Sequence, residues 1–146
     1  MLGAAMLSFR LTALRARVLC YSTENPTKVR RALSNLLGDT NLQLTSKKVE
    51  GYYGDPIYII EYRTSDSRII DRVFSGLLRG LGGLMRLAIE EGLEMTSKEH
   101  GRIHLRLDKQ AAYQGRYELC DADAVKLEFS FEGDPREVFE EGGQQS

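Results

Sequence analysis

Two amphipathic helical segments set among strand-like segments constrain the fold of this 146-residue chain most. Apolar residues recur at helical spacing in residues 29–37 and, as a longer stripe, in residues 69–81. A helix with one apolar stripe must bury it against another element. Residues 9–21 and 102–107 supply that partner, because apolar and polar side chains alternate along them as in half-buried strands. The sequence therefore predicts helices packed on a sheet.

Local signals mark the ends of these helices. Asn25, followed by proline, is suited to cap the first helix, and Gly38 is suited to end it. Ser65 or Asp66 is suited to begin the second helix. Glycines near its end interrupt the apolar stripe, because each costs about 1 kcal/mol relative to alanine within a helix. We therefore predict a separate short helix over residues 84–91.

The remaining strands are short and closely spaced. Residues 41–50 and 57–62 flank a glycine-rich turn at 51–56, which predicts an antiparallel hairpin. Residues 116–119 and 125–131 are predicted as the last two strands. The expected fold class is α+β, with a single mixed, largely antiparallel sheet and helices packed on one face. The opposite face of such a sheet stays partly open.

The chain length fits one domain, which we expect over residues 8–132. Residues 1–7 are expected to form a loose N-terminal extension, and residues 133–146 an acidic, disordered tail. Residues 1–23 contain arginines and no acid, which is also typical of a mitochondrial transit peptide. The alternation in the second half of that segment favours a first strand instead. No segment approaches the roughly 20 apolar residues of a membrane span, so no membrane partner is expected.

Charge is distributed unevenly along the chain. Residues 1–116 hold 18 of the 20 Lys and Arg but only 12 of the 21 Asp and Glu, so the C-terminal part is strongly acidic. Such asymmetry indicates a nucleic-acid or membrane partner, or simply an acidic tail. The net charge of −1 is not that of a generic nucleic-acid-binding protein, which would be basic.

The sequence lacks the motifs of nucleotide-binding loops, zinc proteases and serine hydrolases. Asp108, Lys109 and Tyr113 could serve in acid–base catalysis, but no nucleophile or metal-binding motif accompanies them. We therefore predict that the protein is not an enzyme and uses no cofactor.

The histidines and cysteines form no metal-binding motif. His100 and His104 would share a face on a helix, but the surrounding sequence indicates a loop followed by a strand. Cys20 and Cys120 lie far apart in the sequence and belong to no Cys/His cluster. Two reduced thiols in a cytosolic protein are expected, with one long-range disulfide as the alternative.

A dense polar cluster, Asp108-Lys109-Gln110, follows the strand predicted over residues 102–107. Two interpretations of it are open. Asp108 could open a turn beside two solvated side chains, or the cluster could present binding groups at the end of a strand, where loops often carry them.

Basic and aromatic side chains also gather on the predicted sheet. Alternation places Arg15 and Arg17 on one face of the first strand, and their charges could merge with those of neighbouring strands into a phosphate-binding surface. Exposed tyrosines could stack on bases. The alternative is a solvated face, with the tyrosines packed over the sheet edges. The candidate RNA-binding residues are Arg15, Arg17, Lys47, Lys48, Tyr52, Tyr53, Arg106, Lys109 and Gln110.

Three blocks of the sequence together resemble a small archaeal family of RNA-binding proteins known as exosome-subunit-like. The blocks are Ser22-Thr23-Glu24 before the first helix, residues 50–57 around the glycine turn and residues 105–115 around the polar cluster. The resemblance covers roughly residues 8–131. It implies an α+β fold similar to that of the ribosomal protein that binds 5S rRNA. It also implies a cytoplasmic, non-enzymatic role in association with RNA.

These observations predict a non-catalytic RNA-binding protein, with an RNA-processing complex such as the exosome as a further partner. Structured RNA is the expected target. Lys109 and Arg106 would contact phosphates, and Gln110 a base edge or sugar. Tyr52 or Tyr53 would stack on a base. The alternative is a homodimeric protein-interaction module, joined through the open sheet face or a sheet edge, without direct RNA contact.

Overall fold

A six-stranded antiparallel sheet is the framework of the protein in the computed structural model, which describes residues 9–39 and 41–138. The strands lie in the order β2-β3-β1-β6-β5-β4, and each neighbouring pair is antiparallel. The elements follow one another along the chain as β1 (Arg10–Tyr21), α1 (Pro26–Leu37), β2 (Thr45–Glu50), β3 (Pro56–Thr64), α2 (Ser67–Leu81), α3 (Leu84–Gly92), β4 (Leu93–Met95), β5 (His100–Asp108), α4 (Lys109–Tyr113) and β6 (Ala124–Glu132).

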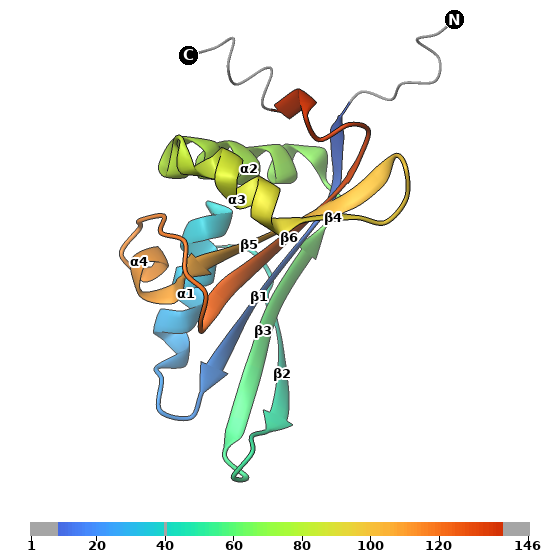
Figure 1. Cartoon of the computed structure of the whole chain (residues 1–146). Coiled ribbons are helices and arrows are strands. Elements are labelled where there is room, and N and C mark those ends of the chain that lie inside the picture. The colour runs from blue at the N-terminus through green and yellow to red at the C-terminus, as the bar shows by residue number, and fades with distance from the viewer. Residues whose placement is uncertain (1–8, 40, 139–146) are drawn as a thin grey trace, which may run out of the picture.

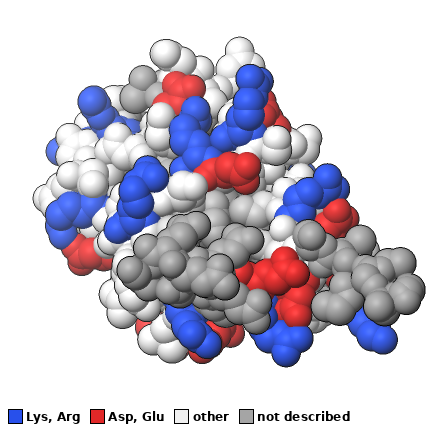
Figure 2. All heavy atoms as spheres, turned by 90° about the horizontal axis from the view of Figure 1, so that it is seen from above, with Lys and Arg blue, Asp and Glu red and all other residues white. Residues whose placement is uncertain are grey.

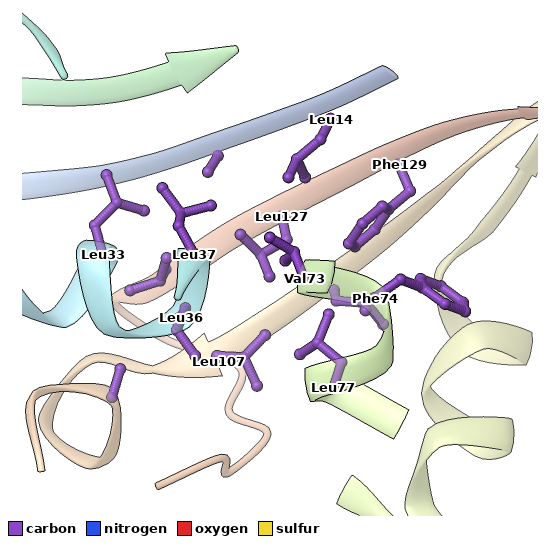
Figure 3. Packing of buried hydrophobic residues seen from close by; sticks show 14 of the residues in the cluster. Leu14, Leu33, Leu36, Leu37, Val73, Phe74, Leu77, Leu107, Leu127 and Phe129 are labelled. Atoms are coloured by element: carbon purple, nitrogen blue, oxygen red, sulfur yellow. The ribbon is translucent and has the colours of Figure 1, made fainter. Parts of the chain in front are cut away.

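The helices cover one face of this sheet (Figure 1), and the hydrophobic core lies between the two layers. Leucines from α1 and apolar side chains from α2 meet Leu14, Leu127 and Phe129 from the central strands (Figure 3). Phe74 of α2 packs edge-on against Phe129, with ring centroids 5.1 Å apart. Each fully buried side chain of this kind contributes about 1.5–3 kcal/mol to stability. The predicted α+β class, with helices on one face of a single sheet, is therefore confirmed.

The predicted helix ends are confirmed by their hydrogen bonds. Asn25 caps α1, since its side chain accepts a hydrogen bond of 2.9 Å from the Thr27 amide, and Pro26 occupies the first turn. Gly38 ends α1 in the left-handed region, at φ 74°. Of the two predicted caps of α2, Asp66 is the one used.

One predicted strand is wrong, and one strand of the sheet was not predicted. Residues 116–119 form only an isolated bridge, between Leu119 and Leu107, because Tyr117 turns inward to pack against α2. The strand beside β5 is instead β4, directly after α3. Gly92 makes this possible, because a Cβ there would lie 1.9 Å from the His104 carbonyl oxygen. The segment after β5 also contains a short helix, α4, where only a turn was predicted.

The predicted extension at residues 1–7 lies outside the described residues, as do residues 139–146 of the predicted tail. The first part of that tail contacts the domain. The Gly133 amide donates to the Glu99 carbonyl at 2.7 Å, and the Glu137 carboxylate accepts a hydrogen bond of 2.8 Å from the Phe9 amide. Val138 packs, partly buried, against the core.

The sheet face opposite the helices carries the alternate side chains of the central strands. Along β5 the burial alternates strictly, with Ile103, Leu105 and Leu107 buried and the residues between them exposed. The same alternation in β1 and β6 brings the polar positions of three adjacent strands onto one surface. We call this surface the open face.

Candidate nucleic-acid interface

Three basic residues lie side by side across the open face. Arg17 of β1 is opposite Lys126 of β6, and Lys126 is opposite Arg106 of β5. Neighbouring strands are about 4.8 Å apart, so the three side chains rise from adjacent positions. We call these three residues the cationic row.

The cationic row has no acidic partner among the described residues. No ion pair joins Arg17 or Lys126 to a carboxylate in this part of the chain, and Arg106 donates only to the Asp121 carbonyl oxygen, at 3.4 Å. On its other side Arg17 is opposite Glu61. That carboxylate is instead paired with two other arginines, Arg15 and Arg63.

The next rows of the open face are neutralised internally. Arg15 lies opposite Glu128, and Glu128 lies opposite His104, so a carboxylate stands between the arginine and the imidazole. The His104 ring lies 2.8 Å from Glu94 and 3.6 Å from Glu128. Arg102 lies 3.6 Å from the same Glu94 carboxylate. Ion pairs therefore occupy this end of the open face, and the cationic row stands apart from them.

The carboxylates in these pairs are held in their charged form. Burial raises the pKa of Glu61, but the hydrogen bonds and positive charges of Arg15 and Arg63 together outweigh this effect and leave the pKa below its ordinary value. The hydrogen bond from His104 likewise lowers the pKa of Glu94. Both acids therefore continue to neutralise their arginines at neutral pH.

The cationic row opposes folding of the free protein. Like charges directly opposite each other in a sheet are destabilising, and an acid at position 126 would remove that repulsion. Positions where a sequence breaks a local rule are often functional. The row lines a shallow hollow of about 230 Å³ together with Arg15, His104 and Glu128. The three cations of the row outnumber the single carboxylate there, so this end of the hollow favours an anion.

The end of the molecule that carries α2 and α3 in Figure 1 shows a different distribution of charge. Seen from above, basic and acidic side chains are interspersed on its visible surface (Figure 2). The open face is thus the place where the described strands bring unpaired cations into register.

Lys109 lies away from the cationic row, and its ammonium group is already hydrogen-bonded within the protein. Its side chain is only 11% exposed, and its ammonium donates to the Leu19 carbonyl at 2.9 Å, to Asp123 at 2.9 Å and to Glu24 at 3.0 Å. Burial lowers the pKa of Lys109, but the hydrogen bonds and negative charges of Asp123 and Glu24 together outweigh this effect and raise the pKa above its ordinary value. An ammonium has three donors, so these partners leave none for a phosphate.

The neighbours of Lys109 complete a local structure. Asp108 caps α4 by accepting a hydrogen bond of 2.8 Å from the Ala111 amide. Asn35 of α1 donates to the carbonyls of Ala112 and Tyr113, which fastens α4 to α1. Gln110 is exposed, but it lines a small hollow with the start of α1 and not the hollow at the cationic row.

The tip of the β2–β3 hairpin carries the two candidate tyrosines. Tyr52 and Tyr53 are 94% and 89% exposed, and their rings meet edge-on with centroids 4.9 Å apart. Lys47 and Lys48 of β2 are also exposed but point to opposite faces of the sheet. Lys47 is the one on the open face, because it lies opposite Ile59, the partner of Leu19 in β1.

The sequence-predicted residues therefore fall into three groups. Arg17 and Arg106 meet in the cationic row, while Arg15 lies beside it in an ion pair. The hairpin residues form a second exposed group. Lys109 and Gln110 lie with the helices.

Sequence reasoning missed Lys126, the central member of the cationic row. The sequence indicates that Lys126 is exposed, because it lies between the apolar residues Val125 and Leu127 in a predicted strand. The missing information was the strand order, which places β6 between β1 and β5.

Other classes of site are not supported by the described residues. Among them, no group of histidine, cysteine and acidic side chains is arranged to hold a metal ion. No helix in residues 9–39 and 41–138 is long and apolar enough to cross a membrane. Cys20 and Cys120 are both free thiols.

Comparison with known proteins places this fold in a family. Residues 13–131 match the model of a family described as RNA binding. A Pyrococcus abyssi protein named RNA-binding protein PAB1135 is 29% identical over 116 residues, which cover 77% of this chain and 75% of the relative.

Solved structures agree with this assignment. Mth689, a DUF54 protein from Methanothermobacter thermautotrophicus, is 28% identical with a TM-score of 0.72, over 92% of this chain and 96% of that one. AF2318 from Archaeglobus fulgidus, also assigned to DUF54, is 26% identical with a TM-score of 0.69, over 82% and 86% of the two chains. Because the family model covers most of the chain, from residue 13 to residue 131, the protein belongs to this RNA-binding family.

Proposed function

We propose that this protein binds RNA through the open face, with the cationic row holding backbone phosphates. The observation that carries the proposal is the register of Arg17, Lys126 and Arg106, three cations without a counter-charge on the described surface. Phosphate groups supply the missing negative charge, and their neutralisation dominates protein–nucleic acid affinity. Family membership and a relative named as an RNA-binding protein support RNA binding itself.

The target is structured RNA recognised mainly through its backbone. A flat face with charged side chains in register suits phosphates more than base edges, which lie in the grooves of a duplex. We propose a non-catalytic role, which is supported by the match to a family described as RNA binding and by the cations and ion-paired acids on the described part of the open face.

The alternative of a homodimer joined through the open face is less favourable. A symmetric dimer places the same patch of both subunits in contact. Two cationic rows would then approach each other, and like charges across an interface cost several kcal/mol. A dimer joined through a sheet edge is a further proposal.

Three other proposals are supported only by the sequence resemblance to the archaeal family. They are association with the exosome, a cytoplasmic location, and a fold like that of the ribosomal protein that binds 5S rRNA.

The test is a salt series of RNA binding with a variant that removes the row. R17Q, K126Q and R106Q combined should weaken binding of an RNA stem-loop. The triple variant should also reduce the steepness of the plot of log affinity against log salt concentration. The slope should fall by about 2–3, because each lost phosphate contact removes about 0.7–0.9 from it.

The matched control is Arg31→Gln, which removes one exposed cation from α1 on the helical side. This variant should keep the slope of the unmodified protein. Equal slopes for the triple variant and the unmodified protein would place the RNA elsewhere.

A further inference from the structure

The hairpin tip holds two tyrosines that neither the turn nor the core requires. They are the central residues of a tight turn, closed by hydrogen bonds from the Gly54 amide to the Gly51 carbonyl at 3.0 Å and from the Gly51 amide to the Asp55 carbonyl at 2.7 Å. Such positions usually carry Gly, Pro, Asn, Asp or Ser. Tyr52 and Tyr53 remain 94% and 89% exposed, so the tip gains little burial from either ring.

The arrangement of the two rings leaves stacking surface free. Tyr52 and Tyr53 meet edge-on, at an interplanar angle of 78°. A planar base can therefore stack on a ring face that the other tyrosine does not cover. Stacking of this kind is tolerant of sequence, since every base has a π-face.

The charges around the tip favour a base there over a phosphate. Glu50 and Asp55 flank the turn and are exposed, so their carboxylates repel a backbone phosphate. Lys47, on the open face, lies between the tip and the cationic row. A chain of nucleotides can thus keep its phosphates near the lysine and direct its bases to the tyrosines.

The tip lies at a distance from the cationic row. Glu61 is opposite Arg17, and the five residue-to-residue steps from Glu61 back to Pro56 span about 17 Å of strand. The hairpin then projects beyond the end of β1 (Figure 1). One RNA that reaches both places must present phosphates at the row and an accessible base well beyond it. Bases inside a duplex are stacked on their neighbours and cannot meet this requirement.

We propose that the RNA partner carries unpaired nucleotides next to a duplex, with the duplex on the cationic row and an unpaired base on Tyr52 and Tyr53. This inference depends on the proposed function and names the class of RNA that the same open face selects. A protein ligand at the tip is the competing explanation for two exposed tyrosines.

The test compares two RNA probes and three forms of the protein. The probes are a blunt RNA duplex and the same duplex extended by a short unpaired strand. The protein is used unmodified, as Y52A with Y53A, and as Y52F with Y53F. Because both rings are exposed, alanine at these positions leaves the core intact, which the unfolding temperature checks.

The double alanine variant should bind the extended RNA about 5- to 150-fold more weakly, as expected for the loss of one stacked base. Its affinity for the blunt duplex should not change. The double phenylalanine variant should match the unmodified protein on both probes, since stacking needs the ring and not the hydroxyl.

The measurements distinguish failure of the stacking inference from failure of the proposed function. If the double alanine variant binds the extended RNA as tightly as the unmodified protein does, the stacking inference is overturned, and a protein ligand becomes the better explanation of the tip. The proposed function survives that result as long as loss of the cationic row still weakens binding of both probes. Equal weakening of both probes by the alanine variant would also overturn the inference.

Discussion

Lys109 and Glu24 form an ion pair of 3.0 Å although 85 residues separate them in the sequence. The pair joins the turn before α1 to the first residue of α4, and Asp123, just before β6, also contacts the Lys109 ammonium, at 2.9 Å. This ion pair therefore brings together two of the sequence blocks that carry the family resemblance, Ser22-Thr23-Glu24 and residues 105–115. The polar cluster beside Asp108 is explained by this contact and by the cap of α4.

Replacing Lys109 with methionine should destabilise the protein without changing how it binds RNA. The variant leaves the Glu24 and Asp123 carboxylates without their cation, and because these carboxylates are partly exposed the loss costs about 1–3 kcal/mol. Chemical denaturation measures this loss. Lys98→Met, which removes an exposed lysine, is the control and should change stability little. A flatter salt slope for Lys109→Met below its unfolding temperature would show that Lys109 does contact phosphate.

The contribution of Lys109 should also disappear at alkaline pH. Its pKa in the folded protein is raised above the ordinary value of 10.5, so its stabilisation is fully present below pH 10.5 and is lost as the pH rises through the folded-state pKa. The difference in unfolding free energy between the unmodified protein and Lys109→Met should therefore shrink above pH 10.5. A difference that stays constant to higher pH would contradict an ionic role.

Replacing Lys126 with glutamine should stabilise the free protein while weakening RNA binding. Removing the central charge relieves repulsion with both Arg17 and Arg106, and a like-charge pair in a sheet costs about 0.2–1 kcal/mol. Thermal or chemical unfolding at low salt should show the gain. The gain should fade as added salt screens the charges. A loss of stability in Lys126→Gln would mean that the lysine has a structural partner.

Replacing Glu61 with glutamine should increase RNA affinity at some cost in stability. Glu61 neutralises both Arg15 and Arg63, so its removal frees two cations beside the cationic row. The salt slope should become steeper by about 1, because one or two more phosphates can be contacted. Glu90→Gln on α3 makes the same change in net charge away from the open face and is the control. An equal gain in affinity for both variants would indicate a general charge effect.

Replacing Gly80 with alanine should destabilise the protein although alanine favours helices. A Cβ at this position would lie 2.2 Å from Cδ2 of Tyr117, so the ring must move. Overpacking costs about 1–3 kcal/mol, which exceeds the gain of about 1 kcal/mol in helix propensity. Gly83→Ala meets no atom within 4 Å and should be neutral or stabilising. If Gly80→Ala proves as stable as Gly83→Ala, then Tyr117 is not seated against α2.

The sequence was sufficient to predict the elements whose signals are local. Asn25 and Gly38 bound α1 through their own conformational preferences, and the alternation around Ile103 and Leu105 identified β5 and its exposed side. The failures came from long-range contacts. The segment containing Tyr117 reads as a strand until the groove on α2 that receives its ring is known.

The candidate site shows the same limit. Arg17 and Arg106 could be recognised as exposed basic residues on strands, but their grouping depends on Lys126 and on the strand order. Lys109 has the same charge and a similar local sequence context. Only the approach of Glu24 and Asp123, from distant parts of the chain, separates a structural lysine from a surface one.

The pairing of β1 with β6 at the centre of the sheet has a consequence for how the protein folds. These strands come from opposite ends of the described chain, so the hydrophobic core closes only when the last strand arrives. During synthesis, Leu14 and Val18 of β1 are made early, and they cannot be buried against Leu127 until β6 has been made. Contacts of such wide sequence separation slow folding and leave apolar surface exposed in the meantime. Completion of the native state is therefore a late event, and the cationic row, which needs both strands, is assembled at the same moment.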